Sequence, residues 1–363
     1  MRKLLKNKPC FIFFFLLIVI GSCKQSETEQ IDPDLPTFNV LIGDKDAFGG
    51  FIMLRKTTDP GIQLMIDASG DVQWSLKADT TLMRAFYPYQ DGFVGLVDEN
   101  TIAEISFQGD TLNFLDLTRQ EIHLHHEIIK SKNGGYLGIT DEYIPIDLST
   151  FDGLSNDTVK TDGIVWLSSS GEILWKWRLD QVLNPLNFPE ISKKKKDWGH
   201  ANALAEDDDG NYLISWRDFN EIWKIDAESG ELIWKYGLTN EPLERGKGAA
   251  KDAFYLQHAI HKSPSGEYLI FDNGNPRFRE SSRAFGFRDN KGQLVPSLSI
   301  TLPDSLFSFK QGSVYEIPDD RLLFCSSMSK YLIITKKTGE IEWLAYSDET
   351  FYRAYYIPGS WIK

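Results

Sequence analysis

The stretch Ile225-Asp-Ala-Glu-Ser-Gly230-Glu-Leu-Ile-Trp234 consists of two short strand-like runs joined by a polar turn that contains glycine. Alternating apolar and polar residues around a turn glycine, which can take a positive φ angle, predict a β-hairpin. Similar stretches occur six times in order, with turn glycines at Gly70, Gly109, Gly171, Gly230, Gly292 and Gly339. An all-strand repeat of about 40–60 residues is typical of propellers. The sequence therefore predicts an all-β protein, a six-bladed β-propeller.

All six histidines of the chain lie in or beside three copies of a second repeat. The copies run from His126 to Tyr136, from His200 to Tyr212 and from His258 to Tyr268, and each ends in Tyr-Leu after a turn with glycine. Equivalent positions of propeller blades surround one axis, so we expect these histidines to converge there. Histidine is the commonest general acid or base near neutral pH and a capable nucleophile. Both His125 and His126 are candidates for the residue of the first copy that faces this site.

Charge and length restrict the class of protein. The chain has 363 residues, a net charge of −13 and an isoelectric point near 5.0. A nucleic-acid backbone requires a basic face on its partner, so we expect no nucleic-acid partner. Length alone would allow two domains, but the even repeat favours one. The oligomeric state stays open.

The N-terminus has the features of a targeting segment. A basic start precedes ten apolar residues, 11–20, which are too few to span a bilayer comfortably. The following Ile20-Gly-Ser-Cys23 resembles a bacterial lipobox. We therefore predict a lipoprotein signal peptide at 1–22, an acylated Cys23 with a flexible tether at 23–37, and the propeller at 38–363. The protein would be lipid-anchored in the cell envelope and would contact the membrane through its acyl chains only. A plain signal peptide with an incidental cysteine is the alternative.

Several short motifs around the histidines occur in a fixed order. They are Leu124-His-His126-Glu127, Trp198-Gly-His200-Ala-Asn202, Ser215-Trp-Arg217-Asp218, Gln257-His258, Phe271-Asp-Asn-Gly274, Ser282-Arg-Ala284 and Tyr352-Arg-Ala354. In sequence and order they resemble the motifs of bacterial arylsulfate sulfotransferases, over nearly the whole chain from Gly49 to Tyr356. Members of that family are six-bladed propellers that move a sulfuryl group between phenols without a nucleotide sulfate donor.

The resemblance implies a role for each matching residue. His258 would be the nucleophile that forms a sulfohistidine, and His200 would protonate the leaving phenolate and later deprotonate the acceptor phenol. Asn202 and Arg217 would bind the sulfuryl oxygens, and His126 would hold or polarise the same group. Arginine offers a fork of donors that suits such oxoanions, and a covalent intermediate gives ping-pong kinetics. The expected partners are a phenolic sulfate donor and a phenol acceptor, and no cofactor or metal is expected.

Two departures from the family pattern concern the site. Ala259 follows His258 where an acidic residue is common, so the group that orients the imidazole has to come from elsewhere. Gly199 replaces a hydroxyl residue before His200.

Two other functions compete with sulfotransfer. The histidines could ligate zinc or copper, although Arg217 near His200 disfavours a cation in the same pocket. A quinoprotein-like or degenerate propeller could instead act as a non-catalytic binding module or scaffold, because similar hairpins occur in such proteins.

Overall fold

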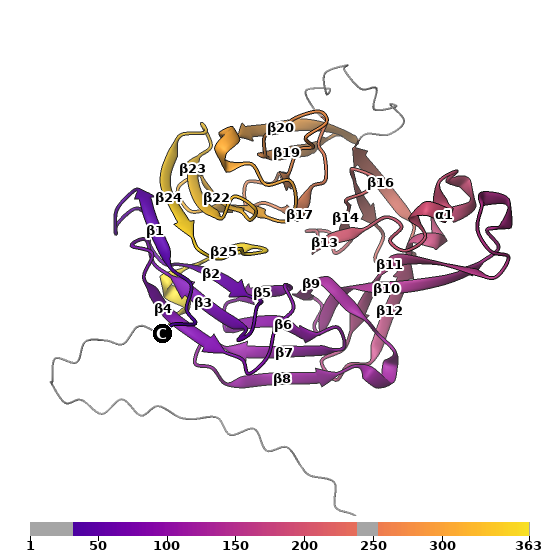
Figure 1. Cartoon of the computed structure of the whole chain (residues 1–363), viewed down its shortest axis with the longest axis horizontal. Coiled ribbons are helices and arrows are strands. Elements are labelled where there is room, and N and C mark those ends of the chain that lie inside the picture. Colours follow the sequence, from indigo (N-terminus) through magenta and orange to yellow (C-terminus); the bar gives the residue numbers. More distant parts are fainter. Residues whose placement is uncertain (1–31, 238–252, 363) are drawn as a thin grey trace, which may run out of the picture. The chain divides into compact units, whose positions relative to one another are not determined.

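The structure is a computed structural model that describes residues 32–237 and 253–362. Its compact unit, Pro36–Lys363, contains six antiparallel sheets arranged around a central axis (Figure 1). The predicted all-β class and the six blades are confirmed. The predicted signal peptide, Cys23 and most of the predicted tether lie outside the described residues.

In each blade, strands that follow one another in the sequence pair side by side as a meander. The exceptions are the first and the last strand of the chain, which each pair with a strand from the opposite end of the chain. The first three blades consist of β25 (Ala354–Ile357), β2 (Phe51–Lys56), β3 (Ile62–Ile66) and β4 (Val72–Lys77); β5 (Phe86–Tyr89), β6 (Gly92–Asp98), β7 (Thr101–Ser106) and β8 (Thr111–Asp116); and β9 (Leu124–Lys130), β10 (Tyr136–Ile146), β11 (Asp157–Leu167) and β12 (Ile173–Arg178).

The other three blades follow in the same order around the axis. They consist of β13 (Ala201–Glu206), β14 (Tyr212–Trp216), β15 (Glu221–Ile225) and β16 (Leu232–Gly237); β17 (His258–Lys262), β18 (Tyr268–Asp272), β19 (Arg283–Asn290) and β20 (Gln293–Thr301); and β21 (Ser313–Ile317), β22 (Arg321–Ser326), β23 (Tyr331–Lys336), β24 (Ile341–Ser347) and β1 (Phe38–Ile42). Figure 1 shows the first strands of the blades nearest the axis.

Both ends of the chain close the ring. The C-terminal strand β25 pairs with β2 as the inner strand of the first blade, and β1 pairs with β24 at the outer edge of the last blade. The described residues contain one short α-helix, α1 (Ile191–Lys194), and no helix among them is long and apolar enough to cross a membrane.

The six predicted hairpins join the third and fourth strands of the blades. Their glycines all have φ angles between 74° and 91°, which a residue with a Cβ rarely adopts. The hairpin tryptophans pack against the next blade, because Trp175 lies 5.2 Å from Tyr212 and Trp234 lies 5.2 Å from Tyr268 between ring centroids. Such pairs contribute about 0.5–1.5 kcal/mol beyond the burial of their area. The tryptophans belong to the hairpin repeat and the tyrosines to the histidine repeat, so residues of the two repeats contact each other between neighbouring blades.

Trp343 makes the equivalent contact where the ring closes. It is fully buried in β24, and its Nε1 donates a hydrogen bond of 2.8 Å to the carbonyl of Ala68 in the first blade. Trp343→Phe leaves this carbonyl without its donor and removes part of a buried ring. We expect the free energy of unfolding to fall by about 2–3 kcal/mol, measured by urea denaturation.

Trp166→Phe is the matched control. The Nε1 of Trp166 also donates to a backbone carbonyl, that of Gly134, but within one blade and at an exposed position. We expect this variant to lose about 1 kcal/mol or less. An equal loss in the two variants would contradict a special role for Trp343 in closing the ring.

Candidate active site

Residues from all six blades meet at the N-terminal ends of the inner strands. Each blade contributes one residue at or near the start of its first strand: Arg84, His126, His200, His258, Gln311 and Tyr352. The Tyr352 ring is central to this group, with centroids 6.1 Å from His126 and 6.0 Å from His258, and Arg84 Cζ lies 6.0 Å from the same ring. His126 and His200 are 5.2 Å apart between centroids. The structure thus brings the three repeat histidines together.

The inner strands depart from regular geometry beside the histidines. His126 and His200 both have φ angles of 54°, and Ala259 has one of 59°, values that are uncommon for residues other than glycine. The strand pairing shifts its register next to each of these residues. β-Bulges of this kind redirect side chains and are frequent beside active sites.

Asn273 fixes the orientation of His258. The Nδ2 of Asn273 donates to the carbonyls of Ser308 and Gln311, both at 2.7 Å, so its Oδ1 must face the Nδ1 of His258, 2.7 Å away. An amide oxygen only accepts, and His258 therefore carries its proton on Nδ1. The other ring nitrogen, Nε2, keeps a lone pair and accepts a long hydrogen bond of 3.3 Å from the Gln311 backbone N–H.

His258 is also held in its neutral form. The side chain is buried, and burial lowers its pKa to about 3, together with the nearby positive charges of Arg217 and Arg353 and despite the hydrogen bond with Asn273. A neutral imidazole with an available Nε2 lone pair is the form that can attack an electrophile.

His200 has a carboxylate partner that His258 lacks. Its Nδ1 lies 2.6 Å from Oδ2 of the exposed Asp197. A carboxylate only accepts hydrogen bonds, so His200 carries a proton on Nδ1 and can release or take a second proton at Nε2. Gly199, whose φ angle is 101°, leads into this residue, and a Cβ there would come within 2.8 Å of the Trp216 ring. A side chain at position 199 would therefore be crowded and strained, which favours glycine there.

His126, rather than His125, lies beside His200 and Tyr352. The Nδ1 atoms of His125 and His126 are 2.7 Å apart. The far nitrogen of His125, Nε2, lies 3.2 Å from Asp141 and 3.1 Å from Asp162. Burial and the neighbouring positive groups, His125 first among them, lower the pKa of His126 well below its usual value.

Asn202 is placed beside His258 but uses part of its amide elsewhere. Its side chain is fully buried, and Nδ2 donates 2.8 Å to the carbonyl of Gln257, the residue before His258. Its Oδ1 is buried without a hydrogen-bond partner among the described residues. Gln257 is itself fixed by three bonds from its Nε2 to Ser215, Trp216 and Glu221. In this arrangement Asn202 ties the second histidine segment to the third.

Arg217 lies at the edge of the same group. Its backbone N–H donates 3.0 Å to the carbonyl of His200, and its guanidinium contacts the carboxylate of the next residue, Asp218, at 2.9 Å. The side chain is 24% exposed, so part of it is open to solvent. All five residues expected from the sequence are therefore close to one another.

Four further residues of the site carry no sequence signal strong enough to assign them. Asn273 and Tyr352 each belong to a motif that gave them no role, while Gln311 and Arg84 belong to no motif; Gln311, Tyr352 and Arg84 lie in loops before inner strands. No repeat marks these loops, and only the closure of the ring brings them to the histidines.

One cluster of the described residues has donors close enough together for a metal ion, namely His125, Asp141 and Asp162. Lys160 Nζ already lies 2.8 Å from Asp141, and His125 faces both carboxylates. These two basic groups supply the positive charge that the carboxylates require, so we assign no metal to the cluster.

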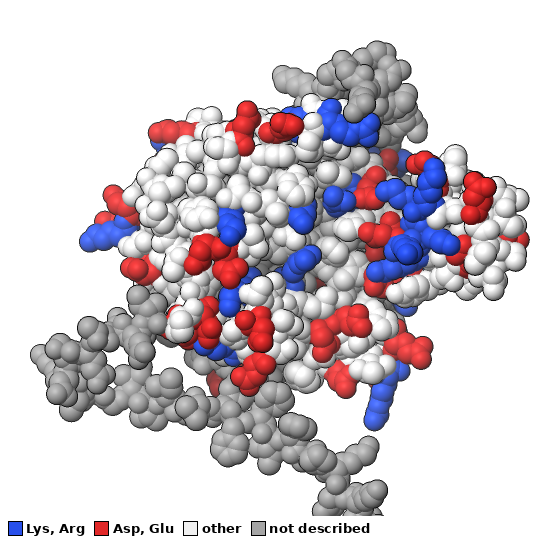
Figure 2. All heavy atoms as spheres, in the orientation of Figure 1, with Lys and Arg blue, Asp and Glu red and all other residues white. Residues whose placement is uncertain are grey.

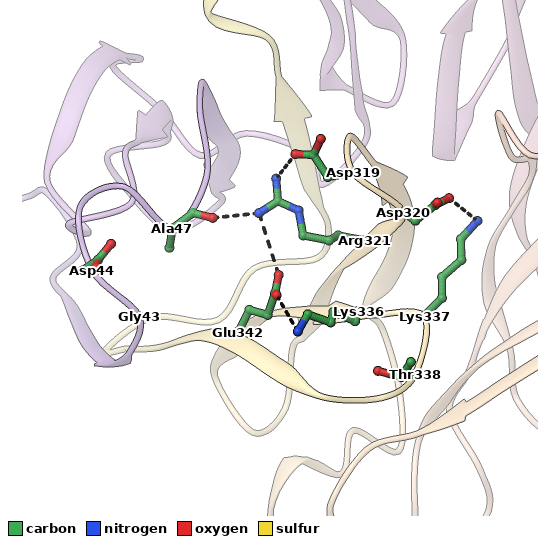
Figure 3. Close-up of a pocket in the computed structure, with 10 residues that line it drawn as sticks. All are labelled: Gly43, Asp44, Ala47, Asp319, Asp320, Arg321, Lys336, Lys337, Thr338 and Glu342. Atoms are coloured by element: carbon green, nitrogen blue, oxygen red, sulfur yellow. Dashed lines mark hydrogen bonds and ion pairs between the residues drawn. The ribbon is translucent and has the colours of Figure 1, made fainter.

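One cavity of the described residues lies away from the histidines. It has a volume of about 630 Å³ and is lined by residues of the loop after β1, of β22 with the turn before it, and of β23 and β24 with the turn between them. Figure 3 shows Arg321 in contact with Asp319, the Ala47 carbonyl and Glu342, at 3.0, 2.7 and 4.0 Å. Lys336 and Lys337 also pair with acidic residues. Because these charges pair with one another, the cavity offers no convergent set of groups for a ligand.

Figure 2 shows lysine and arginine side chains around the middle of the displayed face, with aspartate and glutamate side chains among them.

This six-bladed propeller brings three histidines, an asparagine and an arginine together at one end of its axis. These groups are suited to acid–base and nucleophilic chemistry on an anion. The chain belongs to the arylsulfotransferase (ASST) family, whose sequence model matches residues 39–294. The matched region includes His126, His200, Asn202, Arg217 and His258. The predicted family is therefore confirmed, and the family supports a sulfotransferase that acts on small molecules.

A search of curated proteins gives no match. Among solved structures, a protein of unknown function from Bacteroides caccae aligns with a TM-score of 0.53 and 11% identity, over 84% of this chain and 98% of its own. The β-propeller domain of Cps50 (Swd1) from Myceliophteria thermophila aligns with a TM-score of 0.47 and 11% identity, over 89% and 87%. At this identity such likenesses concern the fold alone.

Proposed function

We propose that this protein moves a sulfuryl group from a phenolic sulfate ester to a phenol, through a sulfohistidine at His258 and without a nucleotide donor. The observation that carries the proposal is the fixed tautomer of His258. Asn273 holds the Nδ1 proton, so Nε2 is the nucleophile. The charges of His200 and Arg217 act on His258, and these two residues supply the acid–base and anion-binding groups that the transfer requires.

In the first half-reaction, His258 Nε2 attacks sulfur and the bond between sulfur and the phenol oxygen breaks. Protonated His200 gives its Nε2 proton to the leaving phenolate oxygen. The imidazole of His258 then carries the sulfuryl group on Nε2 and still a proton on Nδ1, so the ring is positively charged and remains a good leaving group. The Gln311 backbone N–H, which faces Nε2 in the free protein, becomes available to a sulfuryl oxygen.

The second half-reaction reverses these steps with a new phenol. Neutral His200 removes the proton of the acceptor, whose oxygen attacks sulfur, and the bond between sulfur and His258 breaks. Arg217 and the N–H donors around the site stabilise the charge on the sulfuryl oxygens in both transition states. The first half-reaction leaves His200 neutral, as the second requires, and the second half-reaction restores its proton. Because the two half-reactions are separated by the covalent sulfohistidine, we expect ping-pong kinetics.

The direct test uses protein that lacks residues 1–23, p-nitrophenyl sulfate and a phenol acceptor, with a chelator and no nucleotide donor. We expect release of p-nitrophenolate and formation of the sulfated acceptor. A propeller that is only a binding module would bind p-nitrophenyl sulfate without releasing nitrophenolate. Activity that disappears in chelator and returns with a divalent metal would contradict the proposal in favour of a metal enzyme.

We propose also that Cys23 anchors the protein in the cell envelope. The apolar segment would leave with the signal peptide, so attachment would depend on the acyl chains alone. Cys23→Ser should abolish lipid modification and block cleavage of the precursor. Mass spectrometry of the mature N-terminus measures this directly, and an unmodified residue other than Cys23 at that position would contradict the anchor.

A further inference from the structure

The environment of His125 contains two aspartates that face each other across a strand pair. Asp141 of β10 and Asp162 of β11 are register partners in the longest hairpin of the propeller. Like charges directly opposite each other destabilise a sheet. His125 Nε2 lies 3.2 Å from one carboxylate and 3.1 Å from the other. These contacts are close ion pairs without hydrogen-bond geometry, and two carboxylates at such distances favour the protonated form of this nitrogen.

The charge of the cluster favours a second proton on His125. Two carboxylates and Lys160, which lies 2.8 Å from Asp141, leave one uncompensated negative charge. An imidazolium would balance it. Although burial opposes this charge, the contact with Asp162 and the charges of Asp162 and Asp141 raise the pKa of His125 above its usual value. The second proton then lies on Nδ1, between the rings of His125 and His126.

This proton determines which nitrogen of His126 is protonated. The two Nδ1 atoms are 2.7 Å apart, so one of them must donate and the other accept. If His125 donates, His126 Nδ1 is an acceptor and its single proton lies on Nε2. His126 is next to His200 and Tyr352, and its Nε2 has no hydrogen-bond partner among the described residues.

We propose that Asp162 and Asp141 hold His125 as an imidazolium that donates to His126 Nδ1, so that His126 presents a neutral Nε2–H donor to the sulfuryl oxygens. His125 is then a positioning residue, and His126 is an anion-binding group that cannot compete with His258 as nucleophile. Naming the sulfuryl group as the recipient rests on the proposed function, but the direction of the hydrogen bond does not.

Asp162 extends the arrangement to the second histidine segment. Its other carboxylate oxygen accepts 2.6 Å from the backbone N–H of Ala201, the residue after His200. The Asp162 side chain therefore contacts both His125, the partner of His126, and the backbone beside His200. These two contacts keep His126 and His200 at a fixed separation.

The first experiment is ¹⁵N NMR on full-length propeller labelled at histidine, with the His126 signals assigned by their loss in His126→Gln. We expect an unprotonated Nδ1 and a protonated Nε2 in His126 at neutral pH, and both nitrogens protonated in His125. A His126 ring with the proton on Nδ1, or a neutral His125, would overturn the proposal. This readout needs no turnover, so it stands apart from the test of sulfotransfer.

The second experiment compares His125→Asn with His125→Phe. Asparagine can place an amide N–H near the position of Nδ1 and so still donate to His126, whereas phenylalanine cannot. We expect kcat/KM for p-nitrophenyl sulfate to fall on the order of 10- to 100-fold in His125→Phe, as for partners that fix a functional histidine elsewhere, and to recover most of that loss in His125→Asn. The activity of His123→Phe, changed at a half-buried position two residues away that pairs with Glu99, should be unaffected.

The outcomes separate the alternatives. Full activity in His125→Phe would refute a positioning role while leaving sulfotransfer intact. Equal losses in both variants would indicate a packing effect and would also refute it. A melting temperature that falls in chelator and rises again with added Ca²⁺ or Mn²⁺ would assign the cluster to a metal and overturn the imidazolium.

Discussion

Replacing His258 with alanine is expected to lower kcat by on the order of 10⁴-fold or more, the range seen when a covalent nucleophile is removed. Two features make the loss so large. The Nε2 lone pair is the one that Asn273 leaves available by holding the Nδ1 proton, and burial keeps the ring neutral because its pKa falls to about 3. Alanine removes the atom to which sulfur would bond, so both half-reactions stop.

The measurement is steady-state turnover with p-nitrophenyl sulfate, together with mass spectrometry for a sulfuryl adduct on the peptide that contains His258. His123→Ala is the control, because His123 is only half-buried and among the described residues forms an ion pair with Glu99. Normal turnover in His258→Ala would show that the nucleophile is misassigned. An adduct on His126 or His200 in the native protein would show the same and would name the replacement.

The pH dependence follows from the same contacts. Because the pKa of His258 is about 3 in the folded protein, this ring is already neutral throughout the range from about pH 5 upward. An acidic limb of kcat/KM in that range must then come from another group. His258→Ala should also weaken the dependence of stability on acid, because an imidazole that is neutral when folded but protonates near its ordinary pKa when unfolded costs stability as the pH falls below that value.

The blades were predictable from the sequence because their signals are local. Every copy has a turn glycine with a positive φ angle, and four of the six also end in a tryptophan that contacts the next blade, as Gly230 and Trp234 illustrate. Six copies of such a local pattern report the fold even though each of them is weak alone.

The histidines were predictable as a group for a related reason, since their spacing to Tyr136, Tyr212 and Tyr268 repeats with the blades. The identity of the facing residue in the first copy was not predictable. Strict alternation along β9 does not fix it, because the bulge at His126, with its φ angle of 54°, changes the direction of the side chain. A bulge of this kind depends on the neighbouring strand and leaves no mark in the sequence.

Asn202 illustrates the limit of motif matching. The resemblance assigned it to the sulfuryl oxygens, and the structure places its Nδ2 on the Gln257 carbonyl with an unpaired Oδ1. An asparagine has two amide protons, so the second one remains available to a ligand. Its direct role stays a prediction, and its contact with Gln257 adds a positioning role that the sequence did not suggest.

Replacing Arg217 with alanine is the second change with a large expected effect. Its side chain is about three-quarters buried, its backbone N–H donates to the His200 carbonyl, and its charge is among those that lower the pKa of His258. It is therefore placed to meet the oxygens of a group bound between these histidines. Removing one donor of this kind typically costs on the order of 100- to 1,000-fold in kcat, and we expect a loss of that size in kcat/KM for p-nitrophenyl sulfate.

Arg217→Lys distinguishes geometry from charge. Lysine keeps the positive charge but loses the planar fork that matches two oxygens, so we expect it to restore only part of the activity. Arg178→Ala is the control, because Arg178 pairs with Asp180 away from the histidines and should leave turnover unchanged. Binding of a non-transferable aryl sulfonate, measured by calorimetry, should weaken in Arg217→Ala. Unchanged sulfonate affinity with unchanged kcat/KM would mean that this arginine serves Asp218 alone, and the anion would then have to be held by His126 and the backbone of Gln311.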